Sequence, residues 1–318
     1  MPAPVSLPYA PRRILVGASD PSAVMAGLHA ARPDLELRGG PHATLTAADV
    51  AWAEVYVGFR RPPVNDMGAV RWVHSTGAGV DPWLAPAALD PDVLLTRSPQ
   101  SFGPAIAEWA LARVLAFTQR LPELAAAQQA GRWADPGVSR LAGSRALILG
   151  TGDIGGAIAR LLGACGVTVT GVSRSGSPVP GFAAVHPTSE LPALVGDADW
   201  IILALPDTPA TRGVVSRAVL ARCRGAVLLN AGRGAAVEES AVPEALDQGW
   251  LRGAALDVFV TEPLPATSPL WRDPRVIISP HCSGPTMVEG AVQGFLECLT
   301  TLERGAWPRW VIDRAKGY

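Results

Sequence analysis

The sequence predicts an α/β protein of two units, each built around a mostly parallel sheet. Its 318 residues amount most simply to two domains, since a domain typically takes about 100–200 residues. Hydrophobic residues make up 48% of the chain and charged residues 17%, a composition that can bury sizeable cores. Short apolar runs alternate with helical patterns nearly throughout, and this alternation is typical of crossover connections between parallel strands.

Five apolar runs in the first hundred residues predict strands. They cover residues 14–16, 35–37, 55–59, 72–75 and 93–96. A helical pattern at 22–32 separates the first two. A longer one at 104–120 has apolar residues at helical spacing, and we expect it to bridge the two units. A short helix at 123–129 and a loop around Asp135-Pro136-Gly137 follow.

Six further runs predict the strands of the second unit. They cover residues 146–149, 167–172, 200–204, 226–230, 253–256 and 276–279. Most are continuously apolar, as parallel strands covered on both faces should be. A surface loop is expected at 175–180, and a final helix at 288–304 is expected to return to the first unit. The predicted domains are therefore 1–102 plus 285–318, and 103–284.

Composition argues against several classes of protein. The formal net charge is −1, so nothing suggests a basic face for nucleic acid. No apolar run reaches the roughly 18 residues of a membrane span, and the N-terminus lacks the apolar core of a signal peptide. Cys165, Cys223, Cys282 and Cys298 have no CxxC or metal-ligand spacing, so we expect free thiols, no metal site and a cytoplasmic protein.

A glycine-rich turn predicts a dinucleotide site. Gly150-Thr-Gly152-Asp153-Ile154-Gly155 follows a predicted strand and opens a helical pattern. In a GxGxxG turn the first glycine allows the bend, the second admits a pyrophosphate, and the third lets helix and strand pack closely. The helix N-terminus then offers amides and a positive dipole end to the phosphates. The alternative is a tight strand–helix turn without a ligand.

The end of the next strand bears on the choice of cofactor. Enzymes that use NAD usually place an acidic residue there to bind the ribose 2′-hydroxyl, whereas this chain has Ser173-Arg174-Ser175. The arginine can pair with a 2′-phosphate and the two hydroxyls can donate to it. We therefore favour NADP(H) over NAD(H). The alternative is that Arg174 is a solvated charge, or stacks on adenine without selecting a phosphate.

Three polar residues follow strands of the second unit. Arg233, Glu262 and His281 each come just after a predicted strand, where ligands of open parallel sheets bind. An arginine fork suits a substrate carboxylate, a histidine exchanges protons near neutral pH, and a carboxylate beside it orients the ring. Taken singly, each has an ordinary explanation as a surface cation, a structural histidine or part of a turn.

Several separated motifs, in this order, resemble one family. They are Ser75-Thr-Gly77-Ala-Gly79-Val-Asp81, Ala107-Glu108, the glycine turn, Asn230-Ala-Gly-Arg233-Gly234, Leu256-Asp257-Val-Phe, Glu262-Pro263-Leu264 and Pro280-His281. The sequence resembles the D-isomer-specific 2-hydroxyacid dehydrogenases, and within them the glyoxylate/hydroxypyruvate reductase branch. The resemblance implies two Rossmann-like or flavodoxin-like parallel-sheet domains with the active site in the cleft between them. Residues 1–102 plus 285–318 would bind substrate and 103–284 the dinucleotide.

The resemblance also implies roles for individual residues. Arg233 would bind the substrate's carboxylate and carbonyl, His281 would protonate the carbonyl oxygen, and Glu262 would bond to His281 and favour its charged form. The backbone of Thr76, Gly77 and Ala78 would hold the substrate carboxylate. The predicted cofactor contacts are Gly150, Gly152, Asp153, Ile154, Gly155, Ser173, Arg174, Ser175, Leu205, Pro206, Ala231 and Asp257, the last through the nicotinamide carboxamide.

The sequence departs from the family's usual pattern in three places. Ser173 replaces the usual acidic residue, Ala231-Gly232 precedes Arg233 where a bulkier pair is usual, and Cys282-Ser283-Gly284 follows His281. The predicted activity is NAD(P)H-dependent reduction of a small 2-oxo acid to the D-2-hydroxy acid. The alternatives are a nucleotide-sensing, corepressor-like binding protein of the same fold, or another hydride-transfer enzyme such as a phosphonate or phosphite oxidiser. A homodimer is expected, with residues 123–141 near the partner.

Overall fold

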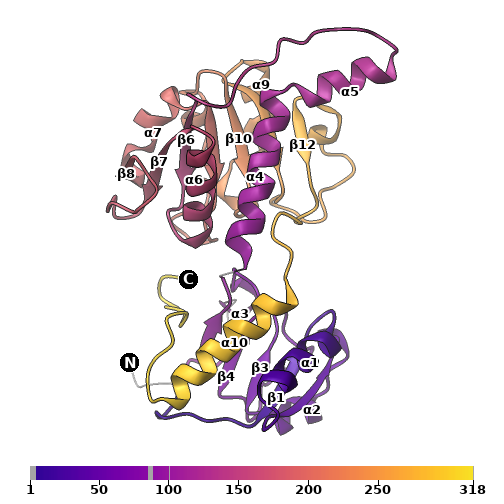
Figure 1. The fold of residues 1–318 in the computed structure, drawn as a ribbon, viewed down its shortest axis with the longest axis vertical. Helices are drawn as coiled ribbons and strands as arrows, with labels where there is room; N and C mark the ends of the chain where they lie inside the picture. The colour runs from indigo at the N-terminus through magenta and orange to yellow at the C-terminus, as the bar shows by residue number, and fades with distance from the viewer. Residues whose placement is uncertain (1–4, 85–88, 100, 318) are drawn as a thin grey trace. The chain divides into compact units, whose positions relative to one another are not determined.

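The computed structural model describes residues 5–84, 89–99 and 101–317. The chain forms two compact units. Unit 1 comprises Met1–Phe102 and Thr286–Tyr318, and unit 2 comprises Gly103–Pro285. Both units are drawn in Figure 1.

Unit 1 contains a five-stranded parallel sheet in the order β2-β1-β3-β4-β5. Its strands are β1 (Arg13–Gly17), β2 (Glu36–Gly40), β3 (Val55–Val57), β4 (Trp72–Ser75) and β5 (Leu94–Arg97). Its helices are α1 (Pro21–Ala31), α2 (Ala47–Trp52), α3 (Asp81–Leu84) and α10 (Val288–Glu303). Local chemistry sets where helices begin: the Asp20 side chain accepts the Ala23 amide before α1, and Thr46 and Asp49 form a capping box at α2.

The two ends of the chain build unit 1 together. Helix α10 lies beside α1 (Figure 1) and adds Phe295, Leu299 and Leu302 to the core formed with β1, β3 and β4. Residues 310–312 then run along β5, where the Arg97 amide donates to Trp310 O (3.2 Å) and the Ile312 amide to Leu95 O (2.9 Å). The first unit is therefore discontinuous in sequence.

Unit 2 contains a seven-stranded parallel sheet in the order β12-β11-β10-β9-β6-β7-β8. Its strands are β6 (Arg145–Leu149), β7 (Thr168–Ser173), β8 (Ala184–Pro187), β9 (Trp200–Leu203), β10 (Ala226–Asn230), β11 (Leu251–Leu256) and β12 (Val276–Ile278). Its main helices are α4 (Phe102–Thr118), which begins one residue before the unit, α5 (Leu121–Gln129), α6 (Asp153–Ala164), α7 (Leu191–Leu194), α8 (Arg217–Leu220) and α9 (Val242–Asp247). The chain changes direction across the sheet between β6 and β9, and ligands bind at such a switch point, outside the carboxyl ends of the strands.

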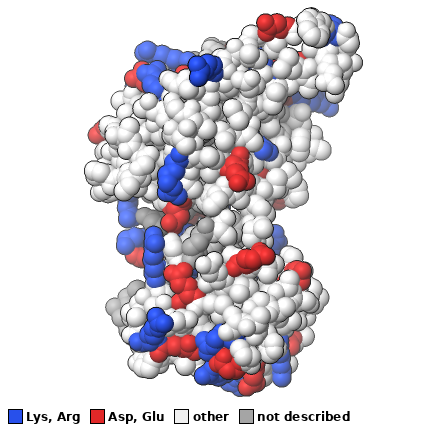
Figure 2. All heavy atoms as spheres, in the orientation of Figure 1, with Lys and Arg blue, Asp and Glu red and all other residues white. Residues whose placement is uncertain are grey.

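The predicted fold class is confirmed, and the predicted strands are present in both sheets. Several details differ. Strand β8 was not predicted, β2 lies at Glu36–Gly40 instead of 35–37, and β3 ends at Val57 instead of residue 59. Strand β11 begins at Leu251 instead of residue 253, and α4 covers Phe102–Thr118 instead of 104–120. No helix in the described residues is long and apolar enough to cross a membrane. On the face seen in Figure 2, acidic and basic side chains are interspersed.

Candidate active site

The glycine turn after β6 is shaped by close approaches within unit 2. Gly150 has φ +100°, and a Cβ there would lie 2.5 Å from Ala204 O at the end of β9. A Cβ on Gly155 would collide with Gly150 O. Glycine is therefore required at both positions for the turn to form and for α6 to pack against β6.

Gly152 is different, because no atom of the described residues requires a glycine at this position. Nothing lies within 4 Å of where its Cβ would be, so the described chain would tolerate a side chain there. Gly152 is the N-cap of α6, and no side chain caps the helix. Open space beside an uncapped helix N-terminus fits a pyrophosphate, whose oxygens would accept from the first amides of α6.

The end of β7 carries the residues predicted to select the cofactor. Ser173 Oγ accepts the Gly176 amide (3.1 Å), and Ser175 Oγ accepts the Ser177 amide (3.2 Å). Both hydroxyls act as acceptors within the turn, so each keeps its own hydrogen to donate. Arg174 and Ser175 are exposed. A guanidinium and two hydroxyls can all donate to a phosphate.

Glu262 and His281 lie together at the carboxyl edge of the sheet. His281 Nδ1 is 2.8 Å from Glu262 Oε2, and Glu262 Oε1 accepts the Phe259 amide (3.0 Å). The carboxylate is thus fixed by its own loop and by the ring. With Nδ1–H donated to Glu262, Nε2 is the nitrogen available for proton exchange.

Asp257 is buried and in direct contact with the backbone of His281, whose amide donates to Asp257 O. It is 0% exposed and accepts three hydrogen bonds: from Ser279 Oγ (2.6 Å) and the Cys282 amide (3.0 Å) at Oδ1, and from the Ser283 amide (2.9 Å) at Oδ2. A carboxylate has about four acceptor positions, so one is left. The contacts of Asp257 organise the loop around His281, and its contact with a carboxamide stays a prediction.

Arg233 follows β10 in a loop that Asn230 holds. Asn230 Nδ2 donates to Arg233 O (3.0 Å), and Asn230 Oδ1 accepts the Gly232 amide (3.1 Å). The next residue, Gly234, packs so tightly on the backbone of Phe259 and Val260 that any Cβ would collide. The arginine loop therefore abuts the loop that leads to Glu262.

The charge of Arg233 also affects the pKa of a carboxyl group, that of Asp207, in the segment after β9. Arg212 binds both oxygens of Asp207 (2.8 and 3.0 Å) and thereby holds the pKa of that carboxyl below its usual value. The positive charge of Arg233 lowers the pKa of Asp207 further, as a smaller effect. The remaining predicted cofactor contacts, Leu205, Pro206 and Ala231, follow β9 and β10 in the same region: a Cβ on Gly232 would lie 2.8 Å from the Leu205 amide nitrogen.

In unit 1, the turn after β4 presents main-chain amides. Arg97 Nη1 donates to Ala78 O (2.6 Å) and Ser75 Oγ donates to Gly79 O (3.2 Å), so two carbonyls of the turn are bound by side chains. The Gly77 amide makes only a long contact with Ser75 Oγ (3.4 Å). Among the described residues, the amides of Thr76, Ala78 and Gly79 have no hydrogen-bond acceptor. Main-chain amides that have no acceptor within a buried turn are typical of an anion-binding site.

Several residues of the site were not predicted from the sequence. Arg97 orients the turn, Asn230 holds the arginine loop, and Ser279 and Trp109 lie behind Asp257. Asn230 could have been found, since an asparagine at a strand end commonly bonds to the following turn. The contact from Trp109 to Ser279 joins residues 170 positions apart, and no local pattern reports it.

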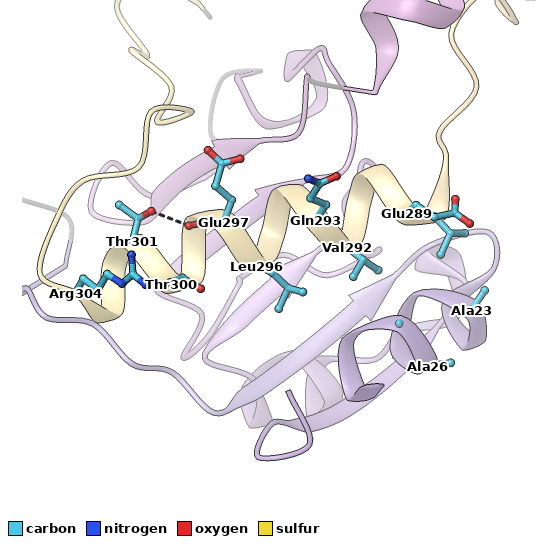
Figure 3. Close-up of a pocket in the computed structure, with 12 residues that line it drawn as sticks. Ala23, Ala26, Glu289, Val292, Gln293, Leu296, Glu297, Thr300, Thr301 and Arg304 are labelled. Carbon is cyan, nitrogen blue, oxygen red and sulfur yellow. Dashed lines mark hydrogen bonds between the residues drawn. The ribbon is translucent and has the colours of Figure 1, made fainter. Parts of the chain in front are cut away.

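A separate groove lies in unit 1, along α1 and α10 (Figure 3). Its volume is about 1040 Å³. Val292 and Leu296 of α10 face it, with Thr300 further along the helix and Arg304 just after its end. None of the predicted site residues lines this groove, so it has no part in the proposed chemistry.

The fold and these loops define a class of protein. A parallel sheet with a phosphate-binding glycine turn, and an imidazole–carboxylate pair at the same edge, is typical of oxidoreductases that use a nicotinamide dinucleotide. Residues 111–283 match the family model of the D-isomer specific 2-hydroxyacid dehydrogenase, NAD binding domain. The chain belongs to this family.

The chain matches known relatives and solved structures over nearly its whole length. The chain is 33% identical to glyoxylate/hydroxypyruvate reductase A of Serratia proteamaculans over 306 residues, 92% of this chain and 95% of that protein. It is similar to a D-isomer specific 2-hydroxyacid dehydrogenase of Xanthobacter autotrophicus Py2 solved with NADPH and MES (31% identity, TM-score 0.89, 98% and 100% of the two chains). It is also similar to an NADPH-dependent glyoxylate/hydroxypyruvate reductase of Sinorhizobium meliloti solved with NADP and sulfate (30%, TM-score 0.86, 96% and 100%). The protein is therefore an NAD(P)-binding oxidoreductase.

Proposed function

We propose that the enzyme reduces a small 2-oxo acid, of the glyoxylate or hydroxypyruvate type, to the D-2-hydroxy acid with NADPH. The observation that carries the proposal is the Glu262–His281 hydrogen bond of 2.8 Å, beside the loop of Arg233 in the unit with the glycine turn. An acid-assisted imidazole, with an arginine on an adjoining loop, suits the reduction of a carbonyl adjacent to a carboxylate.

Each residue then has a distinct task. Arg233 binds the substrate's carboxylate and polarises its carbonyl, and the amides of Thr76, Gly77 and Ala78 bind the carboxylate. His281 donates its Nε2 proton to the carbonyl oxygen, and Glu262 keeps the ring oriented through its hydrogen bond with Nδ1. The first turn of α6 holds the cofactor's pyrophosphate. When bound, the reduced nicotinamide supplies the hydride that adds to C2 of the substrate.

The test is a panel of 2-oxo acids assayed with NADPH and NADH by the loss of absorbance at about 340 nm, a wavelength set by the reduced nicotinamide. Glyoxylate, hydroxypyruvate, pyruvate and phenylpyruvate cover the range of side-chain size. We expect turnover with at least the small members and a product of D configuration. Tight NADPH binding without oxidation by any 2-oxo acid would contradict the proposal and favour the nucleotide-sensing alternative.

The preference for NADPH is part of the proposal, and Ser173→Asp tests it. A carboxylate at the end of β7 repels a 2′-phosphate and accepts a bond from a ribose 2′-hydroxyl. We expect the ratio of kcat/KM with NADPH to kcat/KM with NADH to fall by about 10–100-fold, the effect of one charge-assisted hydrogen bond. Ser177→Asp, in the exposed part of the same loop, is the control and should leave the ratio nearly unchanged. A wild-type enzyme that prefers NADH would refute this preference.

We propose that the protein forms a homodimer through the exposed apolar residues of α5 and of the segment after it. Trp133 is fully exposed, and Leu121 and Val138 are 50% and 55% exposed. Exposed apolar side chains gathered in one segment are typical of an interface. Trp133→Ser should shift the mass measured by sedimentation equilibrium from dimer towards monomer, whereas Trp307→Ser, at a half-exposed tryptophan of unit 1, should not. A monomeric wild-type protein would contradict the prediction. The cytoplasmic location stays a prediction from the sequence.

A further inference from the structure

A chain of hydrogen bonds runs from helix α4 to the loop of His281. Trp109 Nε1 donates to Ser279 Oγ (3.1 Å), and Ser279 Oγ donates to Asp257 Oδ1 (2.6 Å). All three residues are buried, with exposed fractions of 6%, 5% and 0%. The direction of the chain is fixed, because an indole nitrogen can only donate and an ionised carboxylate can only accept. The Arg113 guanidinium lies over the Trp109 ring, 4.8 Å from its centre, and stabilises the position of the indole.

The far end of this chain holds a strained segment of backbone. His281 has φ +50°, a left-handed conformation that residues with a Cβ adopt rarely and only when their surroundings impose it. Here the surroundings are the aspartate: the His281 amide donates to Asp257 O (2.8 Å), and the next two amides donate to its carboxylate (3.0 and 2.9 Å). Asp257 thus fixes three successive peptide units around the imidazole.

We propose that Trp109 and Ser279 are positioning residues for His281. They act through Asp257: the Ser279 hydroxyl holds the carboxylate in the orientation that its two amide donors require, and the indole fixes the hydroxyl. Neither residue touches substrate in this scheme. The inference rests on the proposed function, since it gives these two residues a part in placing the proton donor of that reaction.

The decisive variant is Ser279→Ala, which removes the hydroxyl and leaves both amide bonds to Asp257. We expect kcat for 2-oxo acid reduction to fall about tenfold, as for the loss of a hydrogen bond to a charged group. The KM for NADPH should change less than kcat, because the glycine turn, which holds the pyrophosphate in the proposed function, is untouched. The deuterium isotope effect on kcat with 4-deuterated NADPH should rise, because the chemical step becomes slower. Ser279→Thr keeps the hydroxyl and should restore kcat.

A second readout does not depend on turnover. The chain has five histidines, so the imidazole signals in a ¹H–¹⁵N spectrum of the free protein can be assigned with His281→Asn. Ser279→Ala should shift or broaden the His281 signals. Trp109→Phe should have the same effect in a weaker form, and the double variant should match Ser279→Ala, because the indole acts only through the hydroxyl.

The structure offers a matched control elsewhere in the same sheet. Trp200 Nε1 donates to Ser144 Oγ (2.9 Å), a bond of the same kind just before β6. Ser144→Ala should lower the Tm to a similar degree but leave kcat and the His281 signals unchanged. If Ser279→Ala also lowers only the Tm, the inference is overturned and the bond is merely structural. A wild-type protein without turnover would contradict the proposed function, whereas the spectra would still decide this inference.

Discussion

Replacing Arg233 with methionine is expected to lower kcat/KM for a 2-oxo acid by about 10²–10³-fold, the usual effect of removing one donor to a developing oxyanion. The affinity for NADPH, measured by fluorescence titration, should remain nearly intact. The reason lies in the loop: Arg233 Nη1 donates to Gly232 O (2.8 Å), but Asn230 also binds Arg233 O and the Gly232 amide, so two of these three bonds remain without the guanidinium. Methionine keeps an extended, flexible side chain and removes the charge.

Two further variants make the test of Arg233 specific. Arg233→Lys keeps the charge but loses the planar fork, so activity should recover only in part. Arg212→Met removes a neighbouring, largely exposed arginine that pairs with Asp207, and it should leave kcat/KM close to that of the wild type. An equal loss of activity and NADPH affinity in Arg233→Met would show that the arginine serves the cofactor instead of the substrate.

Replacing His281 with asparagine is expected to lower kcat by about 10²–10⁴-fold, the range that a general acid contributes. Asparagine is the appropriate choice because it tolerates a left-handed backbone better than most residues, and His281 has φ +50°. The Tm and the affinity for NADPH should change little. Glu262→Gln should give a smaller loss of kcat, since the ring keeps a hydrogen-bond partner but loses the adjacent negative charge.

The control for His281 is a second histidine–glutamate pair in unit 2. His186 Nδ1 lies 2.8 Å from Glu190 Oε2, the same distance as in the pair proposed to be catalytic, but His186 belongs to edge strand β8. His186→Asn should leave kcat unchanged. If His281→Asn retained most of the wild-type kcat, proton donation would have to be assigned to another group.

The features that could be predicted from the sequence are those encoded in local patterns of hydrophobic and turn residues. The continuously apolar strands of unit 2 were found because burial on both faces leaves an unbroken run of apolar residues. Strand β8, by contrast, is half exposed and ends in Pro187, so neither hydrophobicity nor propensity marked it. Strand β2 is mostly exposed and ends in two glycines, which explains why its predicted bounds were too early and too short.

The residues of the candidate site that could be predicted are those that come shortly after the end of a strand. Arg233, Glu262 and His281 each stand after a strand end, and the parallel order β12-β11-β10 brings those ends to one edge. Arg97, which binds Ala78 O, and Ser279, which binds Asp257, act through contacts between distant segments. Such contacts depend on side-chain packing in three dimensions, which periodicity and spacing do not encode.

The discontinuous build of unit 1 has a consequence for how the chain matures. During synthesis, residues 1–102 leave the ribosome before unit 2, but Phe295, Leu299 and Leu302, which complete their hydrophobic core, emerge only after all of unit 2. Domains fold as units while the chain is being made. Unit 2 can therefore reach its native state first. Until α10 is synthesised, the apolar surface of residues 1–102 that α10 will cover remains exposed to water, to misassembly and to capture by chaperones.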